Sequence, residues 1–256
     1  MGIRLYLITH DEQIFHPRFF QSVLSANQGA GEIAGAAIVK RTRKETTLAS
    51  LKHLHQMGGV AAILGVAAHL ASKRVRMALG SQEPASVRTV FESWHIPVRE
   101  IDSPNQPDFV EQLKALQLDV VYCSITNMLK TPILKTPRLG CVNRHSGKLP
   151  EYRGAEPVFH ALRRRESSLT VTYHSMVEQL DGGTVLWEHT EPVRERDSVF
   201  SLYDRLFQAA ANGFWPAMQS LEKGGIRAVN LEGSAVYKKP TPEEIAEYRK
   251  LGRSYI

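Results

Sequence analysis

The feature that most constrains the fold is an alternation of short apolar runs with segments of helical periodicity. Apolar runs with the length of buried strands occupy residues 3–9, 33–40, 98–101, 118–124 and 140–143. Segments between them place apolar side chains at helical spacing. Strands that alternate with helices run parallel and are covered on both faces. The pattern therefore predicts an α/β fold: a Rossmann-like, mostly parallel twisted sheet with helices on both faces.

The chain shows no internal repeat and no long linker. We expect one catalytic domain over residues 1–222 and a short C-terminal extension over residues 223–256. In that extension, residues 226–229 and 235–237 have the composition of a small hairpin-like strand pair. Proline and acidic residues at 240–244 then begin a final helix, where the helix dipole favours negative charge.

Composition places the chain among ordinary globular proteins, with 43% hydrophobic and 23% charged residues. Its two cysteines, Cys123 and Cys141, show no pairing signature, which favours a reducing compartment, so we expect a cytoplasmic protein. The most apolar run, residues 57–71, is too short and too rich in Gly and Ala to span a bilayer. We interpret it as a buried helix or a helix-turn-strand and expect no membrane partner.

The candidate chemistry lies between residues 139 and 186. Asn143 ends the predicted strand and His145 follows two positions later, so in extended backbone their side chains project to the same side. An amide can donate a hydrogen bond to a developing oxyanion, and an imidazole can move a proton. Asp181 precedes Gly182-Gly183 in a loop, where its carboxylate can support the charged imidazole. Together these residues indicate acyl transfer to an amine.

The order of these motifs resembles the folate-dependent formyltransferase family. The resemblance rests on Leu-Gly-Cys-Val-Asn-Arg-His at 139–145, Leu-Pro at 149–150, Tyr-Arg-Gly at 152–154 and Leu-Asp-Gly-Gly at 180–183. It is strong over residues 118–206 and weak before residue 98. The resemblance implies Asn143, His145 and Asp181 as the catalytic set and 10-formyltetrahydrofolate as the formyl donor.

The same resemblance implies residues that bind folate, on the strand and loop over 120–129 and in the loop before Asp181. These are Val121, Tyr122, Ser124, Ile125, Leu129 and Leu180. His174 falls on the family's Thr-x-His strand and is a candidate to line the substrate site. Arg153 either binds substrate or pins a loop, and His10 either contacts the acceptor or is a loop histidine without a role. No metal is expected, because His53 and His55 do not share a helix face.

Departures from the family pattern bear on the acceptor. Gly147-Lys148 stands where the family has Ser-Leu, and Ser124 to Asn127 replaces a glycine-bearing folate loop. The first strand is followed by His-Asp-Glu-Gln at 10–13, without the Gly-rich loop that cradles phosphate in the family's ribonucleotide enzymes. A nucleotide-phosphate acceptor is therefore disfavoured, and residues 10–16 with neighbouring loops are expected to choose the acceptor.

We expect a small-molecule amine, either an amino sugar or a modified amino acid. The stretch after Leu221 is too short for the tRNA-binding domain of the family's tRNA-acting members, so tRNA is an unlikely partner. Two alternatives remain open: a 10-formyltetrahydrofolate hydrolase, with water replacing the amine, and a non-catalytic folate-binding module. The sequence does not indicate an oligomeric state.

Overall fold

The computed structural model describes residues 2–40 and 47–256. The strands are β1 (Ile3–Thr9), β2 (Gly31–Val39), β3 (Val98–Ile101), β4 (Val120–Ser124), β5 (Gly140–His145), β6 (Arg153–Gly154), β7 (Ser168–Ser175), β8 (Thr184–Pro192), β9 (Arg227–Ala228) and β10 (Val236–Tyr237). The helices are α1 (His16–Ser25), α2 (Thr47–Ala78), α3 (Val87–Ser93), α4 (Pro107–Ala115), α5 (Thr131–Leu134), α6 (Pro157–Arg163), α7 (Val199–Glu222) and α8 (Pro242–Lys250).

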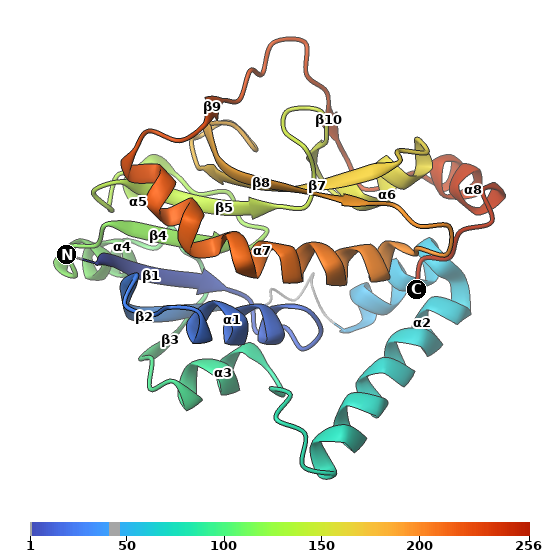
Figure 1. Ribbon diagram of the computed structural model, residues 1–256, viewed down its shortest axis with the longest axis horizontal. Helices are drawn as coiled ribbons and strands as arrows, with labels where there is room; N and C mark the ends of the chain where they lie inside the picture. The colour runs from blue at the N-terminus through green and yellow to red at the C-terminus, as the bar shows by residue number, and fades with distance from the viewer. Residues whose placement is uncertain (1, 41–46) are drawn as a thin grey trace.

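One sheet of eight strands organises the molecule, in the order β3-β2-β1-β4-β5-β7-β8-β9 (Figure 1). The strands from β3 to β5 are parallel, whereas β7, β8 and β9 continue the sheet in antiparallel pairing. The predicted α/β class with a mostly parallel sheet is confirmed. The carboxyl ends of β1, β4 and β5 meet at one edge, where ligands bind in such sheets.

Helices cover both faces of the sheet because the strands alternate their apolar side chains. Leu5 and Leu7 of β1 face a core that includes residues of α1, α3 and α7. Tyr6 and Ile8 face a second core with residues of α4 and α5. Pro17 lies in the first turn of α1, where its missing N–H costs no hydrogen bond.

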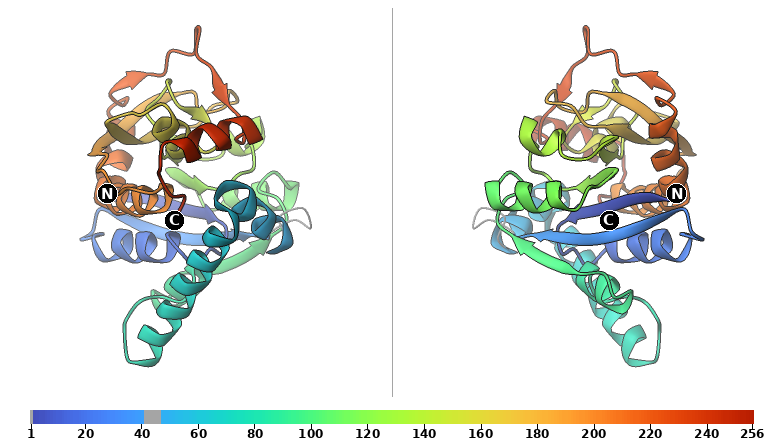
Figure 2. Two further views of the ribbon diagram at one scale, coloured as in Figure 1. Left: turned by 90° about the vertical axis from the view of Figure 1, so that its right-hand side faces the viewer. Right: turned by 90° about the vertical axis from the view of Figure 1, so that its left-hand side faces the viewer.

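Helix α2 is helical as predicted, but the expectation that it is buried is wrong. Val60 and Leu64 are 60% and 62% exposed, and α2 projects away from the sheet (Figure 2). A helix with apolar residues on every side buries only the face that another element covers. At Gly59 the backbone leaves helical geometry, with φ 67° and ψ −159°.

Within the described ranges, one helical segment, Ser50–Ala78, is long and apolar enough to cross a membrane by length and composition alone. Only 11% of its most apolar window is buried. Core helices of soluble proteins and signal sequences can have the same length and apolar composition, so these two properties do not identify a membrane-spanning helix. The absence of a membrane partner therefore stays a prediction.

The two small C-terminal strands do not form the predicted hairpin. β9 pairs antiparallel with β8 at the edge of the main sheet, whereas β10 pairs in parallel with β6. The two short apolar stretches are close in sequence, but each pairs with the exposed edge of a different strand, β8 for β9 and β6 for β10. Both strands thus attach residues after 222 to the catalytic half, and the division at that residue stays a prediction.

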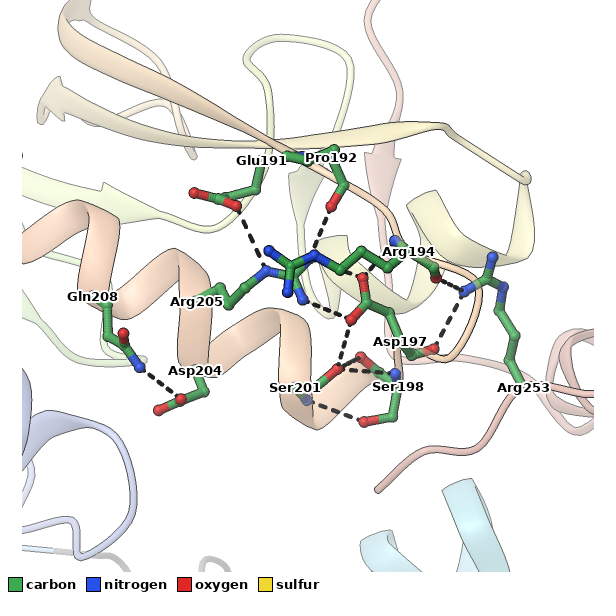
Figure 3. Close-up of polar contacts among 10 residues, drawn as sticks. All are labelled: Glu191, Pro192, Arg194, Asp197, Ser198, Ser201, Asp204, Arg205, Gln208 and Arg253. Carbon is green, nitrogen blue, oxygen red and sulfur yellow. Dashed lines mark hydrogen bonds and ion pairs between the residues drawn. The ribbon is translucent and has the colours of Figure 1, made fainter.

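A polar network holds the C-terminal tail against the start of α7 (Figure 3). Asp197 accepts hydrogen bonds from Arg205 at 2.6 and 2.8 Å and from the backbone N–H of Arg194 at 2.7 Å. Arg253 donates to the backbone carbonyls of Arg194 and Asp197. Burial raises the pKa of Asp197, but its bonds to Arg205 and Arg194 lower it more, so it is charged at neutral pH.

Candidate active site

The predicted catalytic residues converge at the carboxyl end of β5. Asn143 and His145 lie near the end of that strand, and Asp181 lies in the loop between β7 and β8. β7 pairs with β5 so that Asn143 is opposite His174. We call these four residues, Asn143, His145, His174 and Asp181, the catalytic cluster.

Asp181 stands between the two imidazoles of the cluster. Its Oδ1 lies 3.8 Å from Nδ1 of His145 and 3.9 Å from Nε2 of His174. Both distances exceed a direct hydrogen bond, but the carboxylate is close enough to stabilise a positive charge on His145 when that ring is protonated. Asp181 Oδ2 accepts the backbone N–H of Gly154 at 2.7 Å, which anchors the carboxylate.

His145 is held by the backbone that follows it. Its Nε2 donates to the carbonyl of Tyr152 at 2.6 Å, so in the neutral ring Nδ1 is the nitrogen without a proton. Nδ1 faces Asp181 and is therefore the ring nitrogen that can accept a proton. A side chain at Gly147 would place its Cβ 2.9 Å from His145 Nε2, so the glycine that departs from the family pattern leaves room for this imidazole.

His174 orients the amide of Asn143. Its Nδ1 donates to the carbonyls of Ser175 and Gly182, at 3.0 and 2.9 Å. That leaves Nε2 as an acceptor for Asn143 Nδ2 at 3.3 Å. Burial lowers the pKa of His174 even though Asp181 attracts its proton, so this ring stays neutral. The second N–H of Asn143 is then available to a ligand.

Arg153 contacts the loop that carries Asp181. Its Nε and Nη2 donate to the carbonyl of Leu180 at 3.0 and 2.6 Å, and its Nη1 donates to Ser234 Oγ at 2.8 Å. These bonds support the loop-pinning interpretation and leave its role toward substrate a prediction. Gly154, the next residue, has φ 98°, and a Cβ there would lie 2.1 Å from the carbonyl oxygen of Tyr237.

The residues assigned to folate lie on β4, on the loop after it and beside Asp181. Val121, Tyr122, Ser124 and Leu129 are buried, Ile125 is half-buried and Leu180 is exposed. The side chains of Val121 and Tyr122 pack in the cores on opposite faces of the sheet, so a ligand at this edge meets them through the backbone. Their role in binding stays a prediction.

A second polar chain links the loop after β1 to the end of β4. Glu12 accepts the backbone N–H groups of Ile14, Phe15 and His16, and lies 3.1 Å from His16 Nδ1. His16 Nε2 is 2.8 Å from Ser124 Oγ. Burial raises the pKa of Glu12, but the bonds and charge of His16 lower it more. Sequence patterns did not predict these contacts, because His16 and Ser124 are 108 positions apart in the chain.

The remaining histidine predicted at this edge is His10. Its Nδ1 lies 3.1 Å from the carbonyl of Val39, and Thr126 Oγ1 is 3.5 Å from its Nε2. The ring thus joins β2 to the loop after β4, and acceptor contact by His10 stays a prediction. Over the described ranges, no group of three or more His, Cys, Asp or Glu side chains is arranged to hold a metal ion.

The chain is similar in sequence to known formyltransferases. Methionyl-tRNA formyltransferase of Chlorobium phaeovibrioides is 29% identical over 158 residues, which cover 62% of this chain and 50% of that protein. The enzyme of the same name from Bacillus mycoides is 29% identical over 173 residues, 66% of this chain and 55% of that protein. The chain thus spans about half the length of these relatives.

Solved structures share the fold at low identity. A phosphoribosylglycinamide formyltransferase of Bacillus halodurans has a TM-score of 0.58 at 18% identity, covering 86% of this chain and 94% of that one. A sugar N-formyltransferase of a Shewanella species has a TM-score of 0.58 at 13% identity, covering 92% and 76%. The formyl transferase family profile matches residues 38–218. A match over more than half of the chain, with the catalytic cluster assembled inside it, shows that this protein belongs to the formyl transferase family.

Proposed function

We propose that this protein is an N-formyltransferase that moves a formyl group from 10-formyltetrahydrofolate to the primary amine of a small molecule. The observation that carries the proposal is the convergence of Asn143, His145 and Asp181, with Asp181 Oδ1 3.8 Å from His145 Nδ1. An amide donor, an imidazole and a carboxylate at one sheet edge are the groups that acyl transfer to an amine requires.

The loops assigned to the donor fit an apolar ring system. Met128, Val177 and Leu180 are exposed large apolar side chains, and they stand on the loop after β4 and on the loop before Asp181. Thr131 Oγ1 donates to Glu178 Oε1, which joins the start of α5, where the loop after β4 ends, to the loop before Asp181. Exposed apolar side chains on adjoining loops are typical of a ligand surface, which supports folate binding there.

The donor supplies an electrophilic formyl group. Asn143, whose amide is oriented by His174, donates its free N–H to the oxygen where negative charge develops. His145 takes a proton at Nδ1 from the attacking amine and returns it to the leaving nitrogen. Asp181 stabilises the imidazolium that forms between these steps.

The test is to incubate the protein with 10-formyltetrahydrofolate and a panel of amines, and to measure release of tetrahydrofolate. The panel contains amino sugars, modified amino acids and an aminoacylated tRNA, because the relatives named above are methionyl-tRNA formyltransferases. Release that requires a small amine supports the proposal. Release with the aminoacylated tRNA alone overturns the expected acceptor class.

Two rival functions are separated by the same assay. Release of tetrahydrofolate without any amine identifies a hydrolase. Folate binding without release under any condition identifies a non-catalytic module. The assembled catalytic cluster favours transfer over the second rival, because a binding module has no need of a carboxylate between two imidazoles.

We also propose a cytoplasmic location. Cys123 and Cys141 are both free and buried, which supports a reducing compartment. Burial raises the pKa of the Cys141 thiol to about 12, so it is unreactive at neutral pH.

A further inference from the structure

A cavity of about 780 Å³ lies at the carboxyl ends of β1 and β5, and it is lined by Arg144, which stands between Asn143 and His145 on β5. Its walls come from the loop after β1, from α2, from the start of α7 and from the last residues of the chain. Aromatic rings form much of the lining: Phe15 packs on Phe200 and Phe207 with centroids 4.8 and 5.2 Å apart. We call this space the acceptor cavity. Such walls suit an apolar ligand better than a polyhydroxylated one.

The carboxylates that border the acceptor cavity are already engaged within the protein. Glu12 accepts three backbone N–H groups and contacts His16. Glu156 lies 3.1 Å from His53 Nε2. Asp11 accepts the backbone N–H of Arg88 at 3.2 Å. Glu12 is the most fully engaged of the three, and each of the others has at least one partner within the protein.

Arg144 is different, because no carboxylate in the described part of the chain pairs with it. Its guanidinium carbon lies 3.7 Å from the centroid of the Phe207 ring, and Nη1 donates to Ser146 Oγ at 2.6 Å. Its Nε is buried, and no residue in 2–40 or 47–256 makes a hydrogen bond to it. A half-buried guanidinium that lacks an anion has lost hydration without full compensation, so a ligand anion would stabilise it.

The position of Arg144 ties this anion site to the reaction. Arg144 lies between Asn143 and His145 on β5 and points to the opposite face of the strand. β4 pairs with β5 only as far as Asn143. A molecule in the space beyond that last pair lies beside the edge of β5, where it can extend an anionic group toward Arg144 on one face and an amine toward Asn143 on the other.

We propose that the acceptor is a small amine with an apolar body and a carboxylate, and that Arg144 binds that carboxylate. This inference rests on the proposed formyl transfer and goes beyond it, because it chooses an amino acid type of acceptor over an amino sugar. The carboxylate and the amine must be separated enough to reach opposite faces of β5. Acceptors with a carboxylate remote from the amine are accordingly preferred over α-amino acids.

The experiment compares ω-amino carboxylic acids of increasing chain length with their carboxamides, which keep shape but lose the charge. Binding is measured first, as the rise in melting temperature that each compound causes, because it does not depend on formyl transfer. We expect the carboxylate to bind about tenfold to hundredfold more tightly than its carboxamide, as a charge-assisted bond to arginine would give. Glucosamine serves as the amino-sugar comparison and should bind most weakly.

The variant Arg144→Gln should remove the preference for the carboxylate and leave carboxamide binding unchanged. Arg138→Gln is the matched control, since it loses the same charge near the amino end of β5, where Arg138 pairs with Asp119. Equal binding of carboxylate and carboxamide by the wild-type protein overturns the inference, whether or not the variant folds. Tighter binding of glucosamine overturns it as well.

Kinetic measurements separate this inference from the proposed function. If carboxylates bind through Arg144 but no amine is formylated, the proposed function fails and the assignment of the cavity stands. If transfer occurs and KM for the carboxylate acceptor is unchanged in Arg144→Gln, the proposed function stands and this inference fails. The supporting result is a rise in KM for the carboxylate alone, with kcat retained.

Discussion

The catalytic cluster and the acceptor cavity lie on opposite sides of one strand, β5, and they are built in opposite ways. The cluster brings together polar groups from residues 143–181, each held by a bond to backbone or to another member. The cavity is apolar, and its walls come from segments near both ends of the chain, from Asp11 to Ile256. The cluster is thus a largely local arrangement, whereas the cavity depends on how distant segments pack.

The largest expected effect distinguishes the two regions kinetically. A substitution in the catalytic cluster should change kcat, and one in the acceptor cavity should change KM for the acceptor. His145→Ala should lower kcat roughly 10²- to 10⁴-fold, because it removes the proton-transfer group while donor and acceptor still bind. Phe200→Ala, in the wall of the acceptor cavity, should instead raise KM for the acceptor. Steady-state kinetics of both variants check this. A normal kcat in a folded His145→Ala protein would sink the catalytic assignment.

The next largest effect is expected at Gly154, beside the cluster, where the positive φ favours glycine. Gly154→Ala would place a Cβ 2.1 Å from the Tyr237 carbonyl at φ 98°, so β6 and β10 must separate and Asp181 loses its anchor. We expect a loss of stability of about 2–4 kcal/mol together with a fall in kcat.

Gly233→Ala is the matched control for that substitution. Its φ is also positive, at 67°, but nothing lies within 4 Å of the new Cβ, so only backbone strain remains. Urea unfolding of both variants measures the difference. Equal losses of stability would show that the contact with Tyr237 is unimportant.

The contacts of His16 with Glu12 and Ser124, at the edge of the acceptor cavity, should affect stability more than turnover. His16→Ala leaves Glu12 without its imidazole partner and Ser124 without a bond, which should cost about 1–3 kcal/mol. His189→Ala breaks an exposed histidine–carboxylate pair and should cost below about 1 kcal/mol. Denaturant unfolding compares the two variants, and a kcat loss in His16→Ala as large as in His145→Ala would erase the distinction between the regions.

The smallest effect is the pH dependence that His174 adds. Burial lowers its pKa in the folded state below the ordinary 6.5, so below that pH the unfolded chain binds a proton that the folded chain excludes. The contribution of neutral His174 to the free energy of unfolding is present above pH 6.5 and is lost as pH falls toward the folded pKa. The free energy of unfolding falls by up to about 1.4 kcal/mol per pH unit in this range. Unfolding measured from neutral to mildly acidic pH should show this slope, and His174→Gln should reduce it.

Much of the fold was predictable because periodicity reports burial directly. On β7 the apolar side chains of Leu169, Val171 and Tyr173 lie in the core, and His174 on the other face contacts Asn143. The helix at α2 was predictable in type but not in burial, because apolar composition does not say whether another element covers it. The hairpin predicted near the C-terminus was wrong for a related reason, since short strands pair with whichever edge is nearest.

Spacings within short segments were enough to predict the α/β class, the strand that ends at Asn143, and the reaction family. The folded structure was needed to show that Asp181 stands between two imidazoles and that His174 contacts the amide of Asn143. It was also needed to show that Arg144, which pairs with no carboxylate in the described ranges, lines a cavity with aromatic walls. Those relations depend on contacts between residues far apart in the chain. Packing of the whole molecule sets such contacts, and no local pattern of residues records them.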